Sequence, residues 1–232
     1  MQDNLDYKTY IFLSSKNIII SVYTELDKKV LEEEFLIENS KNTIDFQKLY
    51  HFLDENIFII EKKLKNFINK VTVILDSESF FFIEVSVKNN YENIFNLKNI
   101  NRLLFDAKNY CKKTLDNNKI VHIIINNYRV DNQDHSYLPK STQCKSFSLD
   151  VSFLCIPEHL ILSLEEILKK YQISLNKIVS ANYVKKFLSD DEKDIFLMSD
   201  KIIKGFNSNE AILVNKTNEN MGFFEKFFNL FN

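Results

Sequence analysis

Apolar and polar positions form three short alternating blocks near the start of the chain. Blocks at residues 10–13, 18–23 and 30–37 are separated by polar turns, which predicts three strands of an antiparallel meander. From residue 43 the apolar positions recur every three or four residues as far as 67, as in a long amphipathic helix with one buried face. The run "VTVIL" at 71–75 then predicts a buried strand, which the helix would place parallel to a neighbour.

After residue 76 the pattern repeats with different lengths and predicts a strand-helix-strand-strand unit. Its expected elements are a strand at 80–87, a helix at 97–115, and strands at 120–130 and 145–156. Pro157 indicates the start of another helix, and the remaining elements are a strand at 178–179, a short helix at 184–188 and a last strand at 195–198. Residues beyond 205 are polar and rich in asparagine, which is typical of a linker.

Composition narrows the classes of function. The chain of 232 residues is 45% hydrophobic, enough to bury a core in one large or two small domains. Its 30 basic and 32 acidic residues are mixed along the sequence, so we expect no nucleic-acid partner. Three widely spaced cysteines outside any CxxC pattern are interpreted as core thiols. The polar N-terminus and the lack of a long apolar run predict a cytosolic protein.

Three segments, in this order, resemble the bacterial cell-division protein FtsA, an actin-like protein. They are "TIDFQKLYHFLDENIFIIEKKLKNFINKVTVIL", with Asp45 and Glu61 at the family's acidic positions, "LDNNKIVHIIINNYRVDN", and "SLEEILKKYQISLNKIVSANYVKKFLSDDEKDIFLMSD". The resemblance covers about residues 10–205 and implies an α/β fold. A partial actin-like (ribonuclease-H-like) subdomain would comprise 1–83 and 172–205, with an α+β strand-helix-strand-strand subdomain inserted over 84–171. A linker over 206–220 and a C-terminal amphipathic helix over 221–232 would follow.

The resemblance also locates the two phosphate loops of the family, and neither pattern is kept. The first loop has an acid, a glycine and a Ser/Thr-Lys pair, and here "FLSSK" keeps Ser15 and Lys16 but has Ile11 and Leu13 where the acid and the glycine belong. The second would begin at Asp200, where "DKIIKG" replaces a glycine run. Glycines aim backbone N–H groups at phosphate and an acid holds the metal. We therefore expect no enzyme activity, no catalytic or metal-binding residues and no cofactor.

The tail "NMGFFEKFFNLFN" is the candidate binding site. On a helix its apolar residues fall within an arc of roughly 160°, opposite Glu225, Lys226, Asn229 and Asn232. Such a helix could dock on the core or lie on a membrane surface, and the polar linker and the terminal membrane helix of FtsA-like proteins favour the membrane. The predicted membrane-binding residues are Phe223, Phe224, Lys226, Phe227, Phe228, Leu230 and Phe231.

These observations predict a non-enzymatic scaffold of the cell-division machinery, attached to the inner face of the cell membrane at the division site. Expected partners are the membrane surface, other division proteins and further copies of the chain. FtsZ is also a candidate partner, although the half of FtsA that docks its tail has no counterpart in this sequence. Two alternatives stay open: an actin-like pilus-assembly scaffold, and an ATP-binding protein that completes its site by dimerising.

Overall fold

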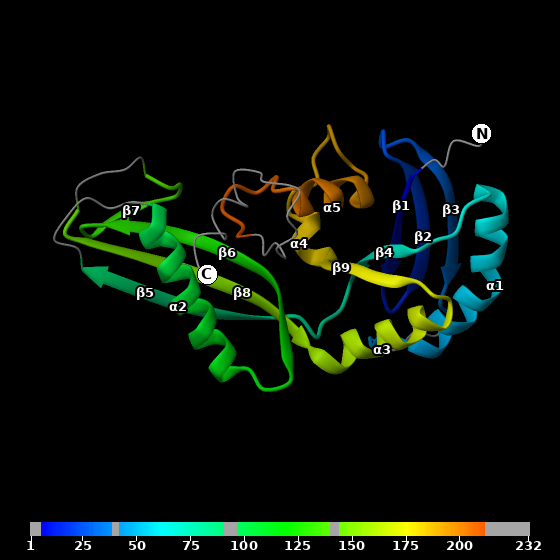
Figure 1. The fold of residues 1–232 in the computed structure, drawn as a ribbon, viewed down its shortest axis with the longest axis horizontal. Helices are drawn as coiled ribbons and strands as arrows, with labels where there is room; N and C mark the ends of the chain where they lie inside the picture. The colour runs from blue at the N-terminus through cyan, green and yellow to red at the C-terminus, as the bar shows by residue number, and fades with distance from the viewer. Residues whose placement is uncertain (1–5, 39–41, 91–96, 140–143, 212–232) are drawn as a thin grey trace. The chain divides into compact units, whose positions relative to one another are not determined.

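The computed structural model describes residues 6–38, 42–90, 97–139 and 144–211, and it divides the chain into two compact units. Unit 1 contains residues 1–80 and 157–204, and unit 2 contains residues 81–156 with the segment from Gly205. Each unit has its own sheet (Figure 1). The predicted fold class, a mixed α/β chain, is confirmed.

Unit 1 is built on a five-stranded sheet with the order β3-β2-β1-β4-β9. The strands are β1 (Tyr7–Leu13), β2 (Asn17–Thr24), β3 (Lys29–Leu36), β4 (Lys70–Leu75) and β9 (Ser174–Ser180). The helices are α1 (Phe46–Leu64), α3 (Glu158–Lys170), α4 (Ala181–Lys185) and α5 (Ile195–Ile203). Strand β1 pairs antiparallel with β2 and parallel with β4, and β4 pairs parallel with β9.

Strands β1 and β4 of unit 1 bury apolar side chains on both faces of the sheet, because helices cover both sides. In β1, Tyr10 and Phe12 point to one face and Ile11 and Leu13 to the other, and all four are buried. Helices α4 and α5 lie on the side of Tyr10 and Phe12, where Phe196 of α5 joins the same core cluster (Figure 1). Helices α1 and α3, which contact each other, lie on the opposite side.

Unit 2 is a four-stranded sheet with the order β5-β8-β6-β7 and one helix packed on it. Its elements are β5 (Phe81–Asn90), α2 (Leu97–Thr114), β6 (Asn118–Val130), β7 (Gln133–His135) and β8 (Ser146–Pro157). Strand β5 pairs antiparallel with β8, and β6 with β7. Helix α2 buries Leu103, Ala107 and Cys111 in a core shared with Phe147 and Phe153 of β8. This helix therefore packs on a sheet of its own, as the inserted unit predicts.

Four details differ from the sequence-based expectations. Residues 195–198 are not a strand, because they begin helix α5. Helix α3 belongs to unit 1 rather than to the inserted part, which ends at Ile156 instead of residue 171. Strand β7 was not predicted. The expected linker begins with residues that bind the sheet of unit 2: the Ile125 N–H donates to the Asn209 carbonyl at 2.8 Å, and the Ala211 N–H to the Ile123 carbonyl at 2.9 Å.

Candidate functional site

The turn between β1 and β2, where a phosphate loop is expected, is closed by its own side chains. The Ser14 hydroxyl accepts hydrogen bonds from the backbone N–H groups of Lys16 and Asn17, at 3.1 and 2.9 Å. It also lies 2.7 Å from Asn17 Oδ1, to which it donates. The Ser14 N–H itself donates to the Asn17 carbonyl at 3.0 Å. The backbone donors of Ser14, Lys16 and Asn17, which could otherwise face an anion, are thus used inside the turn.

The carboxyl ends of the parallel strands are the usual place for a ligand in an α/β sheet. In unit 1 the polar residues at these strand ends form hydrogen bonds with other residues of the same unit. Asp76, directly after β4, accepts a hydrogen bond from Lys185 Nζ at 2.7 Å, and its N–H donates to the Leu13 carbonyl at 2.8 Å. Ser180, at the end of β9, caps α4 by accepting from the Tyr183 N–H. These polar groups stabilise the rim of unit 1.

Asp200, the expected start of the second phosphate loop, lies in the interior of helix α5. Its Oδ2 atom is 2.6 Å from Lys204 Nζ and 3.2 Å from Lys8 Nζ, and Lys8 Nζ is also 2.7 Å from Asp27 Oδ1. The side chains of Lys8 and Asp200 are 12% and 15% exposed, so both are largely shielded from solvent. The network ties α5 to the first residues of β1.

The network shifts the pKa values of its members. Burial alone would raise the pKa of Asp200, but hydrogen bonds from Lys204 and Lys8 outweigh it and hold the pKa below 3.8. The pKa of Lys8 is raised, because its bonds to Asp27 and Asp200 exceed the opposing effect of burial. Burial, followed by the nearby charge of Asp200, raises the pKa of Tyr10. All three groups are therefore held in their usual charge state at neutral pH.

The two expected phosphate-binding positions do not come together. Asp200 is bound to Lys8 at the amino end of β1, whereas Ser14 and Lys16 follow its carboxyl end. Lys8 and Ser14 are six residues apart along an extended strand, which separates them by roughly 20 Å. The structure brings Ser14 and Lys16 into one turn but places Asp200 at the other end of the sheet.

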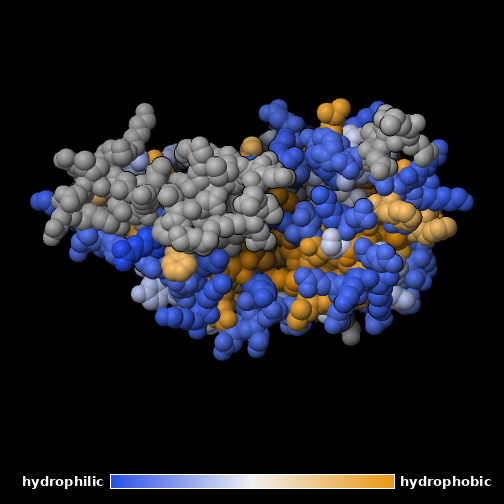
Figure 2. Space-filling model, in the orientation of Figure 1, coloured by the Kyte–Doolittle hydropathy of each residue, from blue (hydrophilic) through white to orange (hydrophobic). Residues whose placement is uncertain are grey.

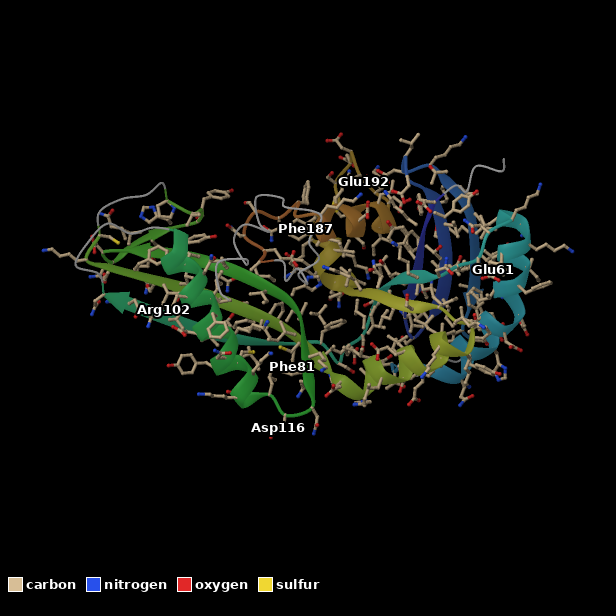
Figure 3. The ribbon with its side chains drawn as sticks, viewed as in Figure 1. Glu61, Phe81, Arg102, Asp116, Phe187 and Glu192 are labelled. Atoms are coloured by element: carbon tan, nitrogen blue, oxygen red, sulfur yellow. The ribbon has the colours of Figure 1, made fainter. Side chains whose placement is uncertain are left out.

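Helix α5 is locked to the sheet by a second cluster next to this network. The Tyr23 hydroxyl donates to Asp194 Oδ2 at 2.6 Å, and burial, followed by this bond, raises the pKa of Tyr23 to about 12. The rings of Tyr10, Tyr23 and Phe196 contact one another, and Lys29 Nζ lies 5.6 Å from the centre of the Tyr23 ring. Glu192, labelled in Figure 3 beside α5, adds an ion pair to Lys201 at 2.8 Å.

In unit 2 a buried pair joins the segment from Gly205 to β6. His122 Nδ1 lies 2.7 Å from Glu210 Oε1, and the two side chains are 4% and 8% exposed. Gly205 itself has φ 92°, a left-handed conformation that suits glycine directly after a helix. The pair could not be predicted from a local pattern, because its members are 88 residues apart along the chain.

The predicted membrane-binding residues, Phe223 to Phe231, lie outside the described residues. Within the described part of the chain, no helix is both long and apolar enough to cross a bilayer. Among the same residues, no three His, Cys, Asp or Glu side chains gather as ligands for a metal ion.

No family model and no curated protein matches the sequence. Among solved structures, the chain is similar to the cytoplasmic domain of EpsL, an inner membrane component of the type II secretion system of Vibrio cholerae, with a TM-score of 0.35 and 14% identity. It is also similar to the PilM-PilN type IV pilus biogenesis complex, with a TM-score of 0.42 and 6% identity. The alignments cover 77% and 76% of this chain but only 57% and 48% of those chains. Similarities with such low TM-scores and such partial coverage do not assign a function to this chain.

Proposed function

We propose that this chain is a non-enzymatic scaffold, which acts by holding proteins together at a membrane surface. The observation that carries the proposal is the closed turn at Ser14. A phosphate loop works because its backbone N–H groups point at the anion. In this turn the Ser14 hydroxyl and the Asn17 carbonyl accept those N–H groups instead.

The position of Asp200 supports the same proposal. In the proposed scaffold it is a structural residue, because its carboxylate is occupied by Lys8 and Lys204 and its backbone is helical. A metal ion bound there would have to displace both lysines.

Calorimetry with Mg-ATP tests the absence of a nucleotide site. We expect no binding tighter than about 100 μM, the range in which a weak but specific site would still be detected. The measurement should cover protein concentrations at which any dimer is populated, because the rival hypothesis completes the site by dimerising. A Lys16→Ala variant is the matched control. Saturable binding that Lys16→Ala abolishes, or any turnover, would establish the alternative of an ATP-binding protein.

Exposed apolar side chains support a role in protein contacts. In unit 1, Phe58 and Ile59 of α1 are 74% and 49% exposed, and Leu36 at the end of β3 is 68% exposed. Figure 2 shows apolar side chains among hydrophilic ones where β3 and α1 lie. Apolar surface of this kind is commonly covered by a partner.

The assembly that this scaffold serves is a separate question. The solved structures named above come from secretion and pilus systems, which correspond to the pilus-assembly alternative and not to cell division. With TM-scores below 0.5 they do not choose between the two. Localisation of a fluorescent fusion does: a focus at mid-cell supports a division scaffold, and foci at pilus or secretion machinery support the alternative.

A further inference from the structure

Strand β5 of unit 2 is a long and regular edge strand. It has ten residues and pairs with β8 over its whole length without a register shift. In the part of the chain that the structure describes, β8 is its only neighbour in the sheet. The backbone N–H and C=O groups that point away from β8 therefore offer a template for another strand.

The outer edge of the sheet in unit 1 is protected in a way that β5 is not. Strand β3 carries three consecutive glutamates, residues 32–34, and its pairing with β2 contains a register shift. Two such strands side by side would oppose like charges, which is a common protection against edge pairing. Strand β5 has no proline, and its charges, Glu84 and Lys88, are opposite in sign and lie on its exposed face.

The order of these charges makes β5 complementary to itself. When a strand pairs antiparallel with its own copy about a two-fold axis at Ser86, Glu84 of each copy lies opposite Lys88 of the other. Val85 then faces Val87 on the side of the sheet that α2 covers. Shifting the axis to Val85 or Val87 removes both charge pairs, and centring it on Glu84 or Lys88 places like charges together. One register is thus favoured over its neighbours.

We propose that β5 is a homodimer interface, in which a second copy of this chain extends the sheet of unit 2 from four strands to eight. The charge complementarity of Glu84 and Lys88, together with the regular edge of β5, favours a second copy of this chain as the partner. In Figure 3, Phe81 lies at the start of β5 and Arg102 lies on α2, the helix that packs on the sheet of unit 2. The proposal is independent of whether the chain binds nucleotide.

Charge reversal of the full chain is the first test. The measurement is the dimer dissociation constant by sedimentation equilibrium, where the dimer has twice the monomer mass of 27.5 kDa. Glu84→Lys turns two attractive cross-strand pairs into two repulsive ones, so we expect it to weaken the dimer roughly tenfold or more. Lys88→Glu should do the same. The double variant Glu84→Lys/Lys88→Glu restores both pairs and should recover the dissociation constant of the unchanged chain.

Disulfide trapping tests the register separately. Only Ser86 lies opposite itself, so Ser86→Cys should cross-link into a covalent dimer under mild oxidation, since directly opposed strand residues have Cα atoms within disulfide range. Asn90→Cys is the matched control: its side chain is also exposed but lies opposite Phe82 of the other copy, so it should not form the cross-link. The native cysteines Cys111, Cys144 and Cys155 are buried and should not interfere.

Three results would overturn the proposal. The first is that the chain remains monomeric up to about 1 mM, which is the weak end of protein association. The second is that the double charge swap fails to restore the dimer. The third is that Asn90→Cys cross-links as fast as Ser86→Cys. Circular dichroism of each variant shows that it is folded, which the exposure of the substituted side chains leads us to expect.

Discussion

Asp200 pairs with two lysines that differ in solvent exposure. This difference decides how much each ion pair contributes to the free energy of unfolding. Lys8 is 12% exposed, whereas Lys204 is 61% exposed and its ion pair is screened by solvent. The buried contact also joins residues 192 positions apart along the chain, because it links α5 to the start of β1. Asp200 therefore stabilises the fold of unit 1 mainly through Lys8.

The Asp200→Asn variant should lower the free energy of unfolding by roughly 1–2 kcal/mol at pH 7, because Lys8 loses one of its two carboxylates. The native pKa of Asp200 lies below its ordinary value of 3.8, so the unfolded state takes up the proton first as pH falls. The contribution is fully present above about pH 4 and is lost as pH falls through the native pKa. Urea denaturation at pH 7 and at about pH 3 measures both effects.

Asp190→Asn is the control for this prediction, because that side chain is fully exposed and pairs with an exposed Lys193. It should leave the free energy of unfolding unchanged at both pH values. A difference between Asp200→Asn and the unchanged chain that is as large at about pH 3 as at pH 7 would contradict the assignment of the effect to the carboxylate charge.

At the residue scale, the turn between β1 and β2 could be predicted from the sequence, whereas the surroundings of Asp200 could not. Residues 14–17 are four consecutive polar residues between two apolar runs, and that pattern directly predicts a turn. The position of Asp200 could not be predicted, because its partner Lys8 is 192 residues away along the chain and no local pattern connects the two. His122 and Glu210 escaped prediction for the same reason.

At the scale of elements, α5 shows why a short apolar run is ambiguous. Residues 195–198, "IFLM", have no period that separates a strand from a buried helix, and we predicted a strand. The signal that was overlooked is Asp194, whose side chain accepts from the backbone N–H groups of Phe196 and Leu197 at 2.9 and 3.3 Å. An aspartate before an apolar run is a typical helix N-cap.

Longer elements were easier to predict because many buried positions repeat the same period. Helix α1 has six buried residues on one face, and it begins at the N-cap Asp45 and ends at Lys65 in the left-handed conformation. Strand β7 was missed because it has three polar residues and no apolar alternation. It is formed by the tight turn at Asp131 and Asn132, both with positive φ, which pairs it with β6.

Asp194 has two roles in fixing α5, and we expect its loss to be costly. In Asp194→Ala the helix loses its cap and the buried Tyr23 hydroxyl loses its acceptor, which together should lower the free energy of unfolding by roughly 2–3 kcal/mol. Tyr23→Phe removes only the hydroxyl bond and should cost about 1 kcal/mol. Asp194→Asn keeps a good capping oxygen and should fall between the two.

Urea denaturation at pH 7 compares the three variants. If Asp194→Ala were no more destabilising than Tyr23→Phe, the cap would contribute nothing and α5 would be held by its aromatic contacts alone. Those contacts are the ring cluster of Tyr10, Tyr23 and Phe196. The comparison thus separates local helix capping from tertiary packing.

At the scale of the whole molecule, the chain has two units of different kinds. Unit 1 has a mixed sheet covered on both faces, with a protected outer edge at β3. Unit 2 has a sheet with an open edge at β5, and it continues into the segment that leads to the tail. In a scaffold, the second unit would then supply self-association, and the tail, which lies outside the described residues, would supply attachment to the membrane.

The tail should bind membranes weakly as a single copy and more strongly when copies are joined. Fully burying one phenylalanine is worth roughly 1.5–3 kcal/mol, but an interfacial helix buries each ring only in part and must be ordered from a segment too short to be stable in water. A dimer raises the effective concentration of the second tail and so strengthens attachment without new contacts. Glu84→Lys should therefore weaken vesicle binding although it leaves the tail unchanged.

Vesicle co-sedimentation of the full chain, a truncation ending at Asn220, and Phe227→Asp/Phe228→Asp measures the contribution of the tail. We expect the full chain to sediment with the vesicles and the other two proteins to stay in solution, since two carboxylates on the apolar side oppose insertion. Asn229→Asp/Asn232→Asp adds the same charge on the polar side and should keep most of the binding to neutral vesicles. Lys226 is offset by Glu225, so added salt should change the affinity only slightly. Equal sedimentation of all four proteins would contradict membrane attachment through the tail and favour a helix that packs on the core.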